Sequence, residues 1–313
     1  MHELAQGLAR AACQDAGVSG TRAGFVALAG RPNVGKSTLV NAIVGHKVAI
    51  VSDKPQTTRR AIRGVATRED AQLVLTDLPG VQRPLDALTE RMQRRVEREL
   101  DETDVALMVI NAEQGVGPGD RWIAGVLANA PCPVVVAVNK IDRLDRNRTV
   151  LALQAAAELG VGDDIFPVSA RRATGVGPLA DHLFSLVPES PFLFAPEEHS
   201  DLSPYVHLAE LIREQILKRT FQEVPHAVEV VVEDVDDARD DLLVVHARAW
   251  VETESQKGIL VGAGGRMVRQ IGTAARKELE RELGTRVHLD LVVRVRRGWR
   301  GDEALLDRLG FDL

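Results

Sequence analysis

The sequence predicts an α/β fold: a doubly wound domain with a mostly parallel sheet flanked by helices, followed by a smaller domain of order α-β-β-α-α-β. Three observations support this prediction. A glycine-rich loop directly follows an apolar strand at residues 25–29. Apolar strands alternate with amphipathic helices up to residue 188, as in βαβ units. The pattern then changes beyond a proline-rich stretch, which indicates a domain boundary. We expect a tail at residues 1–22, a first domain at 23–188, a linker at 189–204 and a second domain at 205–313.

The composition is that of a globular protein. The chain has 313 residues, of which 45% are hydrophobic, enough for two domains with their own cores. It contains no apolar run of 18 residues, so we expect no membrane-spanning helix. The first 20 residues include Glu3 and Asp15 and lack an apolar centre, unlike a secretory signal. Cys13 and Cys132 are the only cysteines and the eight histidines lack metal-site spacing, which favours a reduced cytosolic protein without a transition-metal site.

Charge is distributed unevenly along the chain. The whole sequence carries a formal charge of −6, yet residues 257–300 contain eleven basic and four acidic residues, a local charge of +7. Such a basic block suggests a surface for a polyanion, although an exposed helix would carry many of the same residues. Charge alone therefore leaves nucleic-acid binding and a solvated helix face as two open interpretations.

The first domain is predicted to alternate strands and helices. Its strands are short apolar runs with little polar alternation, as buried parallel strands require. They are expected at residues 25–29, 61–67, 72–76, 105–110, 134–138 and 165–168. Helices are expected at residues 38–44, 121–128, 149–159 and 178–186, together with an amphipathic helix on which Leu85, Leu88, Met92, Val96 and Leu100 recur at near-helical spacing.

The second domain has a different order of elements. Helices are expected at residues 206–217 and 267–283, with a short helix leading into the glycines at 262–265. Strands are expected at residues 227–232, 242–251 and 287–295. The acidic stretch 233–241 between the first two strands is expected to form a solvated hairpin tip and not a metal site.

Residues 30–37 read Gly-Arg-Pro-Asn-Val-Gly-Lys-Ser, which matches the G-x-x-x-x-G-K-[ST] phosphate loop. The preceding strand and the following helix are the context that this loop requires. Gly30 and Gly35 let the backbone curl so that N–H groups point at the phosphates. Lys36 would reach the β- and γ-phosphates, and the Ser37 hydroxyl would ligate Mg²⁺. The predicted nucleotide contacts in this loop are Asn33, Val34, Gly35, Lys36, Ser37 and Thr38.

Two further elements fit a nucleotide switch. Asp77-Leu-Pro-Gly80 follows a strand and fits D-x-x-G, in which Asp77 holds the Mg²⁺ shell and the Gly80 N–H senses the γ-phosphate. The loop at residues 55–59 offers a hydroxyl to close over Mg²⁺, with Thr58 as the preferred ligand and Thr57 as the alternative. The residues predicted to act in hydrolysis are Lys36, Thr58 and Gly80.

Asn139-Lys140-Ile-Asp142 also follows a strand, and it fits the guanine-reading sequence N-K-x-D. The Asp142 carboxylate can accept hydrogen bonds from N1–H and the exocyclic amine of guanine. Adenine lacks this pair of donors, so the sequence favours GTP over ATP. Ser169-Ala170 follows another strand, where a backbone N–H could bind guanine O6. The four elements in this order indicate a GTP-binding switch protein.

The hydrolytic machinery departs from the usual pattern. Many small GTPases place a glutamine after the D-x-x-G glycine to orient the attacking water, whereas this chain has Val81. Valine cannot orient a water molecule. Asn33 stands in the phosphate loop where related GTPases that lack the glutamine use an asparagine to help hold K⁺. We therefore expect slow intrinsic hydrolysis that a monovalent cation or a partner accelerates.

Gly262-Ala263-Gly264-Gly265 lies between two predicted helices inside the basic block. It matches the G-x-x-G loop of KH domains, which clamps about four nucleotides of a nucleic-acid backbone. The order α-β-β-α-α-β is that of a type II KH domain. The alternative is a helix-turn-helix corner that binds no ligand.

With these motifs in place, the chain resembles the Era family of bacterial GTPases over nearly all of residues 23–313. The resemblance depends on several short strings: Gly30–Ser37, Lys54–Arg59, Asp77–Gly80, Asn139–Asp142, Glu254–Gly258 running into Gly262–Gly265, Ile271-Gly272 with Ala275-Arg276-Lys277, and Gly298-Trp299. It implies a P-loop GTPase domain followed by a KH domain. The family usually has lysine in place of Ala263 and threonine in place of Leu78.

The resemblance also implies a function. Era-like proteins bind the 3′ end of small-subunit ribosomal RNA through the KH domain and assist maturation of the small ribosomal subunit. They use GTP and Mg²⁺, and they are cytoplasmic with some peripheral membrane association. We expect a monomer with no DNA partner. The predicted RNA contacts are Gly262, Ala263, Gly264, Gly265 and Arg266, with Arg294 and Arg296 on the last strand.

Two other classes of function stay open from the sequence alone. One is a GTP-regulated binding module with another RNA or a protein partner, whose turnover is incidental. The other is a membrane-associated signalling GTPase, which would draw on residues 1–22 and the basic residues at 294–300. Salt dependence does not separate these classes, because phosphates and anionic lipids both attract lysine and arginine.

Overall fold

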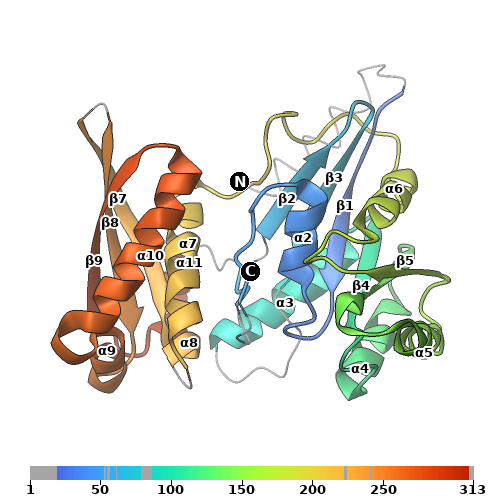
Figure 1. Ribbon diagram of the computed structural model, residues 1–313. Coiled ribbons are helices and arrows are strands. Elements are labelled where there is room, and N and C mark those ends of the chain that lie inside the picture. Colours follow the sequence, from blue (N-terminus) through green and yellow to red (C-terminus); the bar gives the residue numbers. More distant parts are fainter. Residues whose placement is uncertain are drawn as a thin grey trace. The chain divides into compact units, whose positions relative to one another are not determined.

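The computed structural model describes residues 20–52, 54, 57–60, 62–78, 87–221, 224–239 and 241–309 (Figure 1). Its contacts divide the chain into two compact units. The first unit takes in the described residues of 20–49, 62–78 and 93–201, and the second takes in those of 50–60, 87–92 and 202–309. The described residues of 50–60 thus cluster with the second unit, whereas the sequence predicts them inside the first domain.

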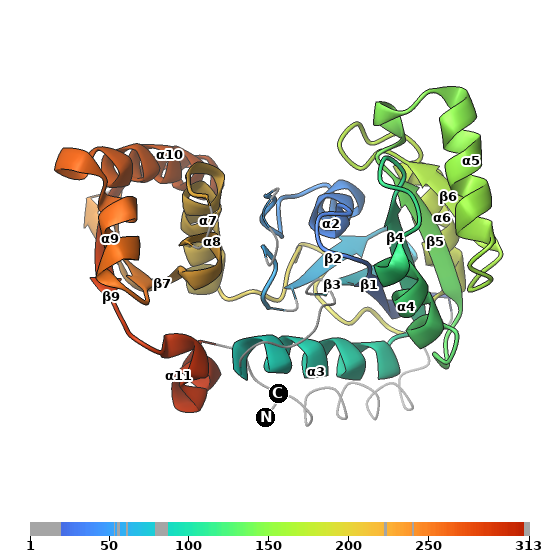
Figure 2. The ribbon, with the colours of Figure 1, turned by 90° about the horizontal axis from the view of Figure 1, so that it is seen from below.

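The first unit is built on a six-stranded sheet of order β2-β3-β1-β4-β5-β6 (Figure 2). β3, β1, β4, β5 and β6 are parallel, and β2 joins the edge antiparallel to β3. The strand bounds are β1 Arg22–Ala29, β2 Ile62–Thr67, β3 Ala71–Asp77, β4 Val105–Asn111, β5 Val134–Asn139 and β6 Asp164–Val168. The helix bounds are α2 Lys36–Val44, α3 Ala87–Asp101, α4 Pro118–Leu127, α5 Arg146–Ala157 and α6 Val176–Leu186.

Successive side chains of the central strand β1 point to opposite faces of the sheet, and each face packs in a separate apolar core. Val26 and Leu28 of β1 face α2 and α6, whereas Ala27 and Ala29 face the layer of α3, α4 and α5. A sheet that is covered on both faces needs strands that are apolar throughout, and all seven residues of β4 are buried. This arrangement brings the carboxyl ends of the parallel strands to one edge, where ligands bind in doubly wound folds.

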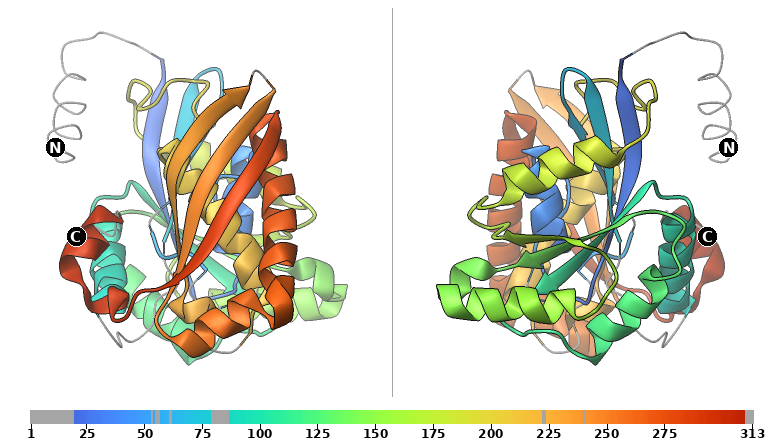
Figure 3. Two further views of the ribbon diagram at one scale, coloured as in Figure 1. Left: turned by 90° about the vertical axis from the view of Figure 1, so that its left-hand side faces the viewer. Right: turned by 90° about the vertical axis from the view of Figure 1, so that its right-hand side faces the viewer.

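The second unit contains a three-stranded sheet of order β7-β8-β9, in which β7 is antiparallel and β9 parallel to β8 (Figure 3). One face packs against α7 and α10, and the apolar core between them includes Ile212, Val245, Ile271 and Val293. On the opposite face, Trp299 and α11 pack against Trp250 of β8. The bounds are α7 Pro204–Arg219, α8 Val224–Ala227, β7 Glu229–Arg239, β8 Leu242–Val251, α9 Glu254–Val261, α10 Arg266–Leu283, β9 Arg286–Val295 and α11 Glu303–Arg308.

The predicted acidic hairpin tip is wrong over most of its length. β7 continues through the acidic residues to Arg239 and stays paired with β8. Register shifts between Val232 and Asp234 and between Asp237 and Arg239 allow this, because each irregularity absorbs an extra residue in one strand. Glu233 therefore lies on a strand, where it pairs with Arg248 at 2.9 Å. The short helices α8 and α11 were likewise not predicted.

Much of the stretch predicted as a linker runs alongside the first sheet with defined hydrogen bonds. Val65 N–H of β2 donates to the His199 carbonyl at 2.9 Å. The fully buried Gln72 carboxamide accepts hydrogen bonds from the N–H groups of Leu193 and Phe194. Gln72 in this way satisfies backbone groups of a segment that lacks regular structure. Within the described part of the chain, no helix combines the length and apolarity needed to cross a bilayer.

Candidate nucleotide site and nucleic-acid surface

The phosphate loop connects β1 to α2 and ends at a glycine that no other residue replaces without strain. Gly35 has φ of 102°, and a Cβ there would lie 2.3 Å from the Asn139 side-chain nitrogen. Asn33 also adopts positive φ, at 62°. These conformations curl the loop, and α2 begins immediately after Gly35, so the N-terminus of the helix points into the loop. A curled loop at a helix N-terminus is a preformed site for phosphate groups.

Lys36 is buried at the base of this loop, with 6% of its surface exposed. Its Nζ donates to the carbonyls of Gly30 at 2.9 Å and Arg31 at 3.2 Å. Burial lowers the pKa of Lys36 to about 8, and the nearby Asp77 carboxylate opposes this effect. Two carbonyls and one carboxylate compensate a buried ammonium incompletely, so anionic phosphate oxygens would stabilise it further.

Ser37 and Asp77 are brought together from different elements. Ser37 lies in the first turn of α2 and Asp77 ends β3, and the serine hydroxyl donates to Asp77 Oδ2 at 2.6 Å. Asp77 is fully buried. A hydroxyl and a carboxylate are the oxygen ligands that Mg²⁺ prefers, so this pair fits the predicted ion. Thr58 lies in the second unit, and Gly80, which is predicted to sense the γ-phosphate, lies with Val81 outside the described residues.

Asn139 and Lys140 tie the guanine loop to the phosphate loop. The Asn139 Nδ2 donates to the Val34 carbonyl at 2.9 Å, and the Lys140 Nζ donates to the Asn33 carbonyl at 2.6 Å. The Asn139 Oδ1 accepts hydrogen bonds from the N–H groups of Lys140 at 2.8 Å and Ala170 at 3.0 Å. One buried amide side chain thereby fixes three backbone segments relative to one another.

Asp142 is held as a carboxylate by its neighbours. The Ser169 hydroxyl donates to Asp142 Oδ1 at 2.6 Å and lowers the pKa of Asp142 below its usual value. The side chain is only 13% exposed, and Arg172 lies 3.9 Å from its other oxygen. That second oxygen is available to accept from guanine. The Ser169 N–H donates to the Thr174 carbonyl, and the Ala170 N–H donates to Asn139, so a bond from either to guanine O6 would have to be shared.

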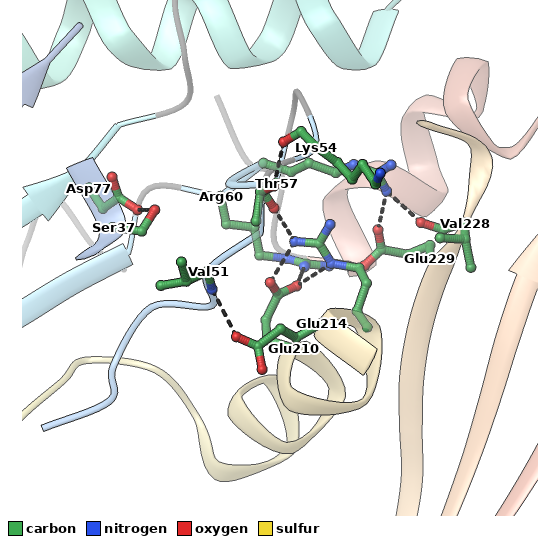
Figure 4. A network of polar contacts seen from close by, with 12 residues as sticks. Ser37, Val51, Lys54, Thr57, Arg60, Asp77, Glu210, Glu214, Val228 and Glu229 are labelled. Atoms are coloured by element: carbon green, nitrogen blue, oxygen red, sulfur yellow. Dashed lines mark hydrogen bonds and ion pairs between the residues drawn. The ribbon is translucent and has the colours of Figure 1, made fainter. Parts of the chain in front are cut away.

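Residues 50–60 are anchored within the second unit by contacts that the sequence did not suggest (Figure 4). Thr57 and Thr58, the two alternative Mg²⁺ ligands, are 8% and 7% exposed. Beside them, the guanidinium groups of Arg59, Arg60 and Arg213 meet the carboxylates of Glu210 and Glu229. No motif signals these ion pairs, because each partner is an ordinary charged residue in the sequence.

The glycine loop at residues 262–265 joins α9 to α10. Gly262, Gly264 and Gly265 have φ of 69°, 61° and 75°, which favour glycine. A Cβ at Gly264 or Gly265 would meet no heavy atom within 4 Å, so the backbone there is open to a ligand. Ala263, Gly264 and Arg266 are exposed, and Arg266 begins α10. The loop therefore places open backbone at Gly264 and Gly265 next to a cationic side chain, while the N–H groups of Gly262 and Gly265 donate to the Gly258 and Gly262 carbonyls.

The two predicted contacts on the last strand differ in their surroundings. Arg294 is exposed and lies next to Val293, which faces the apolar core, so its side chain lies on the opposite face of the sheet. Arg296 is paired with Asp302 at 3.6 Å, and its guanidinium lies 4.7 Å from the centre of the Trp250 ring. Arg296 thus has a structural role within the second unit. RNA binding by either residue stays a prediction.

Comparison with known proteins agrees with a nucleotide site in the first unit and a nucleic-acid surface in the second. Residues 25–140 match the family described as 50S ribosome-binding GTPase, and residues 223–300 match the KH domain family. The chain is 47% identical to the GTPase Era of Mycolicibacterium paratuberculosis, over 93% of this chain and 99% of that protein. It is 34% identical to Era solved in complex with MgGDPNP and nucleotides 1506–1542 of 16S ribosomal RNA, with a TM-score of 0.88 over 94% of this chain and all of that one. A point variant of Aquifex aeolicus Era bound to GDP·AlF4⁻ has 33% identity and a TM-score of 0.87, at 94% and 100% coverage.

These findings confirm the predicted fold: a P-loop GTPase domain with a mostly parallel sheet, followed by a KH domain. The similarity extends over both domains and nearly the full length of the relatives. The chain belongs to the Era family of GTPases.

Proposed function

We propose that this protein binds and hydrolyses GTP in its first unit and binds the 3′ end of small-subunit ribosomal RNA through its second unit, during maturation of the small ribosomal subunit. The observation that carries the proposal is the open backbone at Gly264 and Gly265, next to Arg266, on a chain that also holds a guanine site. A solved Era of 34% identity binds nucleotides of the 16S RNA together with MgGDPNP, which supports the same pairing of ligands.

The nucleotide would be held by three groups of residues. Backbone groups at Asn33, Val34, Gly35 and Thr38 would bind the phosphates with the Lys36 ammonium, Asp142 would accept from guanine, and Asn139 would keep the two loops in register. Lys140, Ser169 and Ala170 would support the guanine site. When Mg²⁺ is bound it neutralises charge on the β- and γ-phosphates, and Ser37, Asp77 and Thr58 would be its protein ligands.

Hydrolysis would be slow without help. Val81 offers no group to orient a water molecule, so the chain depends on charge stabilisation at the phosphates. Lys36 supplies one positive charge there, and Asn33 would help to hold K⁺ as a second. We expect GTP turnover to be several-fold faster in potassium than in sodium, and equal rates would remove the role proposed for Asn33.

The RNA would contact the second unit through its backbone. Gly262–Gly265 would approach the phosphates closely, and Arg266 at the start of α10 would add a charge-assisted contact. Ala263 lacks the ammonium that the family usually places there, so Arg266 has a larger share of the electrostatic attraction. Arg294 would add a weaker contact from β9.

Two measurements on the purified full-length protein test this function. GTP turnover tests the first unit, and binding of a labelled oligonucleotide with the 3′-terminal sequence of the small-subunit RNA, against a scrambled oligonucleotide, tests the second. We expect turnover and a preference for the native oligonucleotide.

We also propose a cytoplasmic location. Binding to anionic vesicles that survives an excess of the oligonucleotide would favour the membrane-associated alternative instead.

A further inference from the structure

Arg31 is the second residue of the phosphate loop, and its side chain contacts the loop between β4 and α4. Arg31 Nε lies 2.8 Å from Asp120 Oδ2, and Arg31 Nη2 donates to the Gly115 carbonyl at 3.2 Å. The phosphate-loop motif accepts any residue at this position, so the motif assigns Arg31 no role. Its side chain nevertheless connects the phosphate loop to a segment 84 residues away.

Asp120 is a fixed anchor for this arginine. It lies in the first turn of α4 and its side chain is fully buried. Asp120 Oδ2 also accepts a hydrogen bond from the Gly117 N–H at 2.8 Å, which caps the helix. Farther along α4, Ile123 and Leu127 pack in the apolar core on this face of the sheet. Asp120 therefore cannot move without disturbing the packing of α4.

The pairing of Arg31 with Asp120 is specific to these two residues. Within the described part of the chain, Arg31 is the cation that forms an ion pair with Asp120. A buried carboxylate is strongly destabilising without such a partner, so the pair holds Arg31 in place. Gly119 leaves room for the arginine, because a Cβ there would lie 2.8 Å from Arg31 Cδ. The first turn of α4 thus both admits the arginine side chain and pairs with its charge.

The loop that holds Arg31 is tied to the guanine site as well. The Ala112 N–H donates to the Asn139 carbonyl at 2.8 Å. Arg143, which directly follows the guanine motif, donates to Glu113 Oε2 at 2.7 Å. Residues 112–120 therefore connect the phosphate loop to the guanine loop by a second route, in addition to the Asn139 side chain.

The main chain of Arg31 contacts the ammonium that would bind the phosphates. Lys36 Nζ donates to the carbonyls of Gly30 and Arg31, at 2.9 and 3.2 Å. Carbonyls in the C-terminal half of the loop are held by the guanine loop instead. The N-terminal half has its side-chain anchor in Arg31, so one residue links the Lys36 ammonium to α4.

We propose that Arg31 is a positioning residue for GTP hydrolysis: its pairing with Asp120 fixes the carbonyls that orient the Lys36 ammonium toward the γ-phosphate. This proposal rests on the nucleotide site proposed above. Charge develops on the phosphates during transfer, so the placement of Lys36 affects the rate of hydrolysis more than the binding of GDP. GDP lacks the γ-phosphate, and its guanine would be held separately by Asp142.

Four variants separate this role from stability. Arg31→Ala removes both side-chain contacts and leaves Asp120 buried without its cation. The double variant Arg31→Ala/Asp120→Asn removes that uncompensated charge, and the asparagine oxygen can still accept from the Gly117 N–H. Arg31→Lys keeps a cation beside Asp120. Arg68→Ala is the matched control, because Arg68 pairs with Asp181 at 2.6 Å on the exposed surface of the same unit.

Three quantities are measured on the full-length protein with Mg²⁺: the single-turnover rate of hydrolysis at saturating GTP, the affinity for GDP and the midpoint of thermal unfolding. We expect Arg31→Ala and the double variant to hydrolyse GTP about tenfold more slowly, with GDP affinities within about threefold of the unmodified protein, because a displaced charge slows the chemical step more than it weakens ground-state binding. The double variant should unfold close to the temperature of the unmodified protein. Arg31→Lys should regain most of the rate, and Arg68→Ala should change none of the three quantities.

An unchanged rate in Arg31→Ala overturns the proposal, and so does a double variant that recovers the rate together with stability. A loss of GDP affinity as large as the loss of rate also contradicts it, since the whole loop and not the placement of Lys36 would then be affected. If Arg31→Ala does not fold, the double variant decides the question. An unmodified protein that hydrolyses no GTP would instead refute the proposed function.

Discussion

The Asn139 side-chain nitrogen donates to the Val34 carbonyl at 2.9 Å, which joins the guanine loop to the phosphate loop across 105 residues of sequence. Asn139→Ala removes this bond and the two that its Oδ1 accepts. At about 1 kcal/mol for each bond, we expect affinity for GDP and GTP to fall together by about 10²-fold. Equilibrium binding of a fluorescent GDP derivative measures this loss.

Asn129→Ala is the matched control for that experiment. The Asn129 side chain donates to the Gly125 carbonyl at an exposed position, so its loss should leave nucleotide affinity unchanged. A loss of affinity confined to GTP would argue against the role of Asn139 in joining the loops, because both nucleotides contact both loops.

Asp142 should determine which base is bound. Asp142→Asn replaces an acceptor by an amide donor, which matches the C2 carbonyl of xanthine and not the amine of guanine. We expect GTP binding to weaken by at least 10²-fold and XTP binding to appear, because a polar site rejects a mismatched partner strongly. Competition between GTP and XTP for binding to the variant measures this change in base preference. A variant that still prefers GTP would mean that Asp142 does not read the base.

Lys36 predicts a pH dependence of nucleotide binding. Its pKa of about 8 lies below the value of 10.5 for an exposed lysine, so the free folded protein loses this proton first as pH rises. Between pH 8 and 10.5 the unfolded chain binds a proton that the folded chain does not, and the free energy of unfolding contributed by this group increases with pH. Below pH 8 the folded state bears the full cost of the buried charge, about 3 kcal/mol.

Bound phosphates should restore the charged form of Lys36. Nucleotide binding is then accompanied by proton uptake above pH 8, and affinity falls by up to about tenfold per pH unit between pH 8 and about 10. Calorimetry in two buffers of different ionisation enthalpy measures the uptake. An arginine at this position stays protonated between pH 8 and about 10, so the nucleotide affinity of Lys36→Arg should not vary with pH over that range. An unmodified protein that takes up no proton at about pH 9 would refute the assignment.

Arg266 should contribute to RNA affinity without affecting the nucleotide. Reversal of its charge in Arg266→Glu should weaken oligonucleotide binding about tenfold or more and reduce the slope of log affinity against log salt by about one. Arg281→Glu is the control, since Arg281 is exposed farther along α10 and pairs with Glu278. GTP affinity should be the same in both variants. Loss of GTP binding in Arg266→Glu would mean that the two functions are not separable.

Local sequence patterns predicted the helices and strands whose formation depends on apolar periodicity and on loop motifs. The strand before Gly30 and the helix after Gly35 follow from apolar runs and one loop motif, and the structure has them as β1 and α2. The core of the second domain was predictable for the same reason, because β8 and α10 have clear periodicity. The β7 extension was not predictable, since its acidic residues resemble a loop and stay in the strand only through register shifts against β8.

The position of residues 50–60 could not be predicted either. Arg59 and Glu229 are 170 residues apart, and nothing in the spacing of charged residues identifies a buried ion pair at that separation. The motif around Thr58 indicates Mg²⁺ chemistry in the first domain, whereas the ion pairs place the segment with the second unit. Gln72 is comparable: its carboxamide satisfies backbone groups 121 and 122 residues away.

The most direct test of the account is a map of RNA crosslinks to the full-length protein in cells, made with the unmodified chain and with Gly264→Asp. Gly264 has open space around its Cβ position, so this substitution places a carboxylate in the glycine loop without a steric clash, and Asp tolerates positive φ better than most residues. We predict crosslinks concentrated at the 3′ end of the small-subunit RNA that Gly264→Asp removes, with GTP hydrolysis retained. Crosslinks to other RNAs, or the same map for both proteins, would contradict the assignment of the glycine loop as the RNA-binding site.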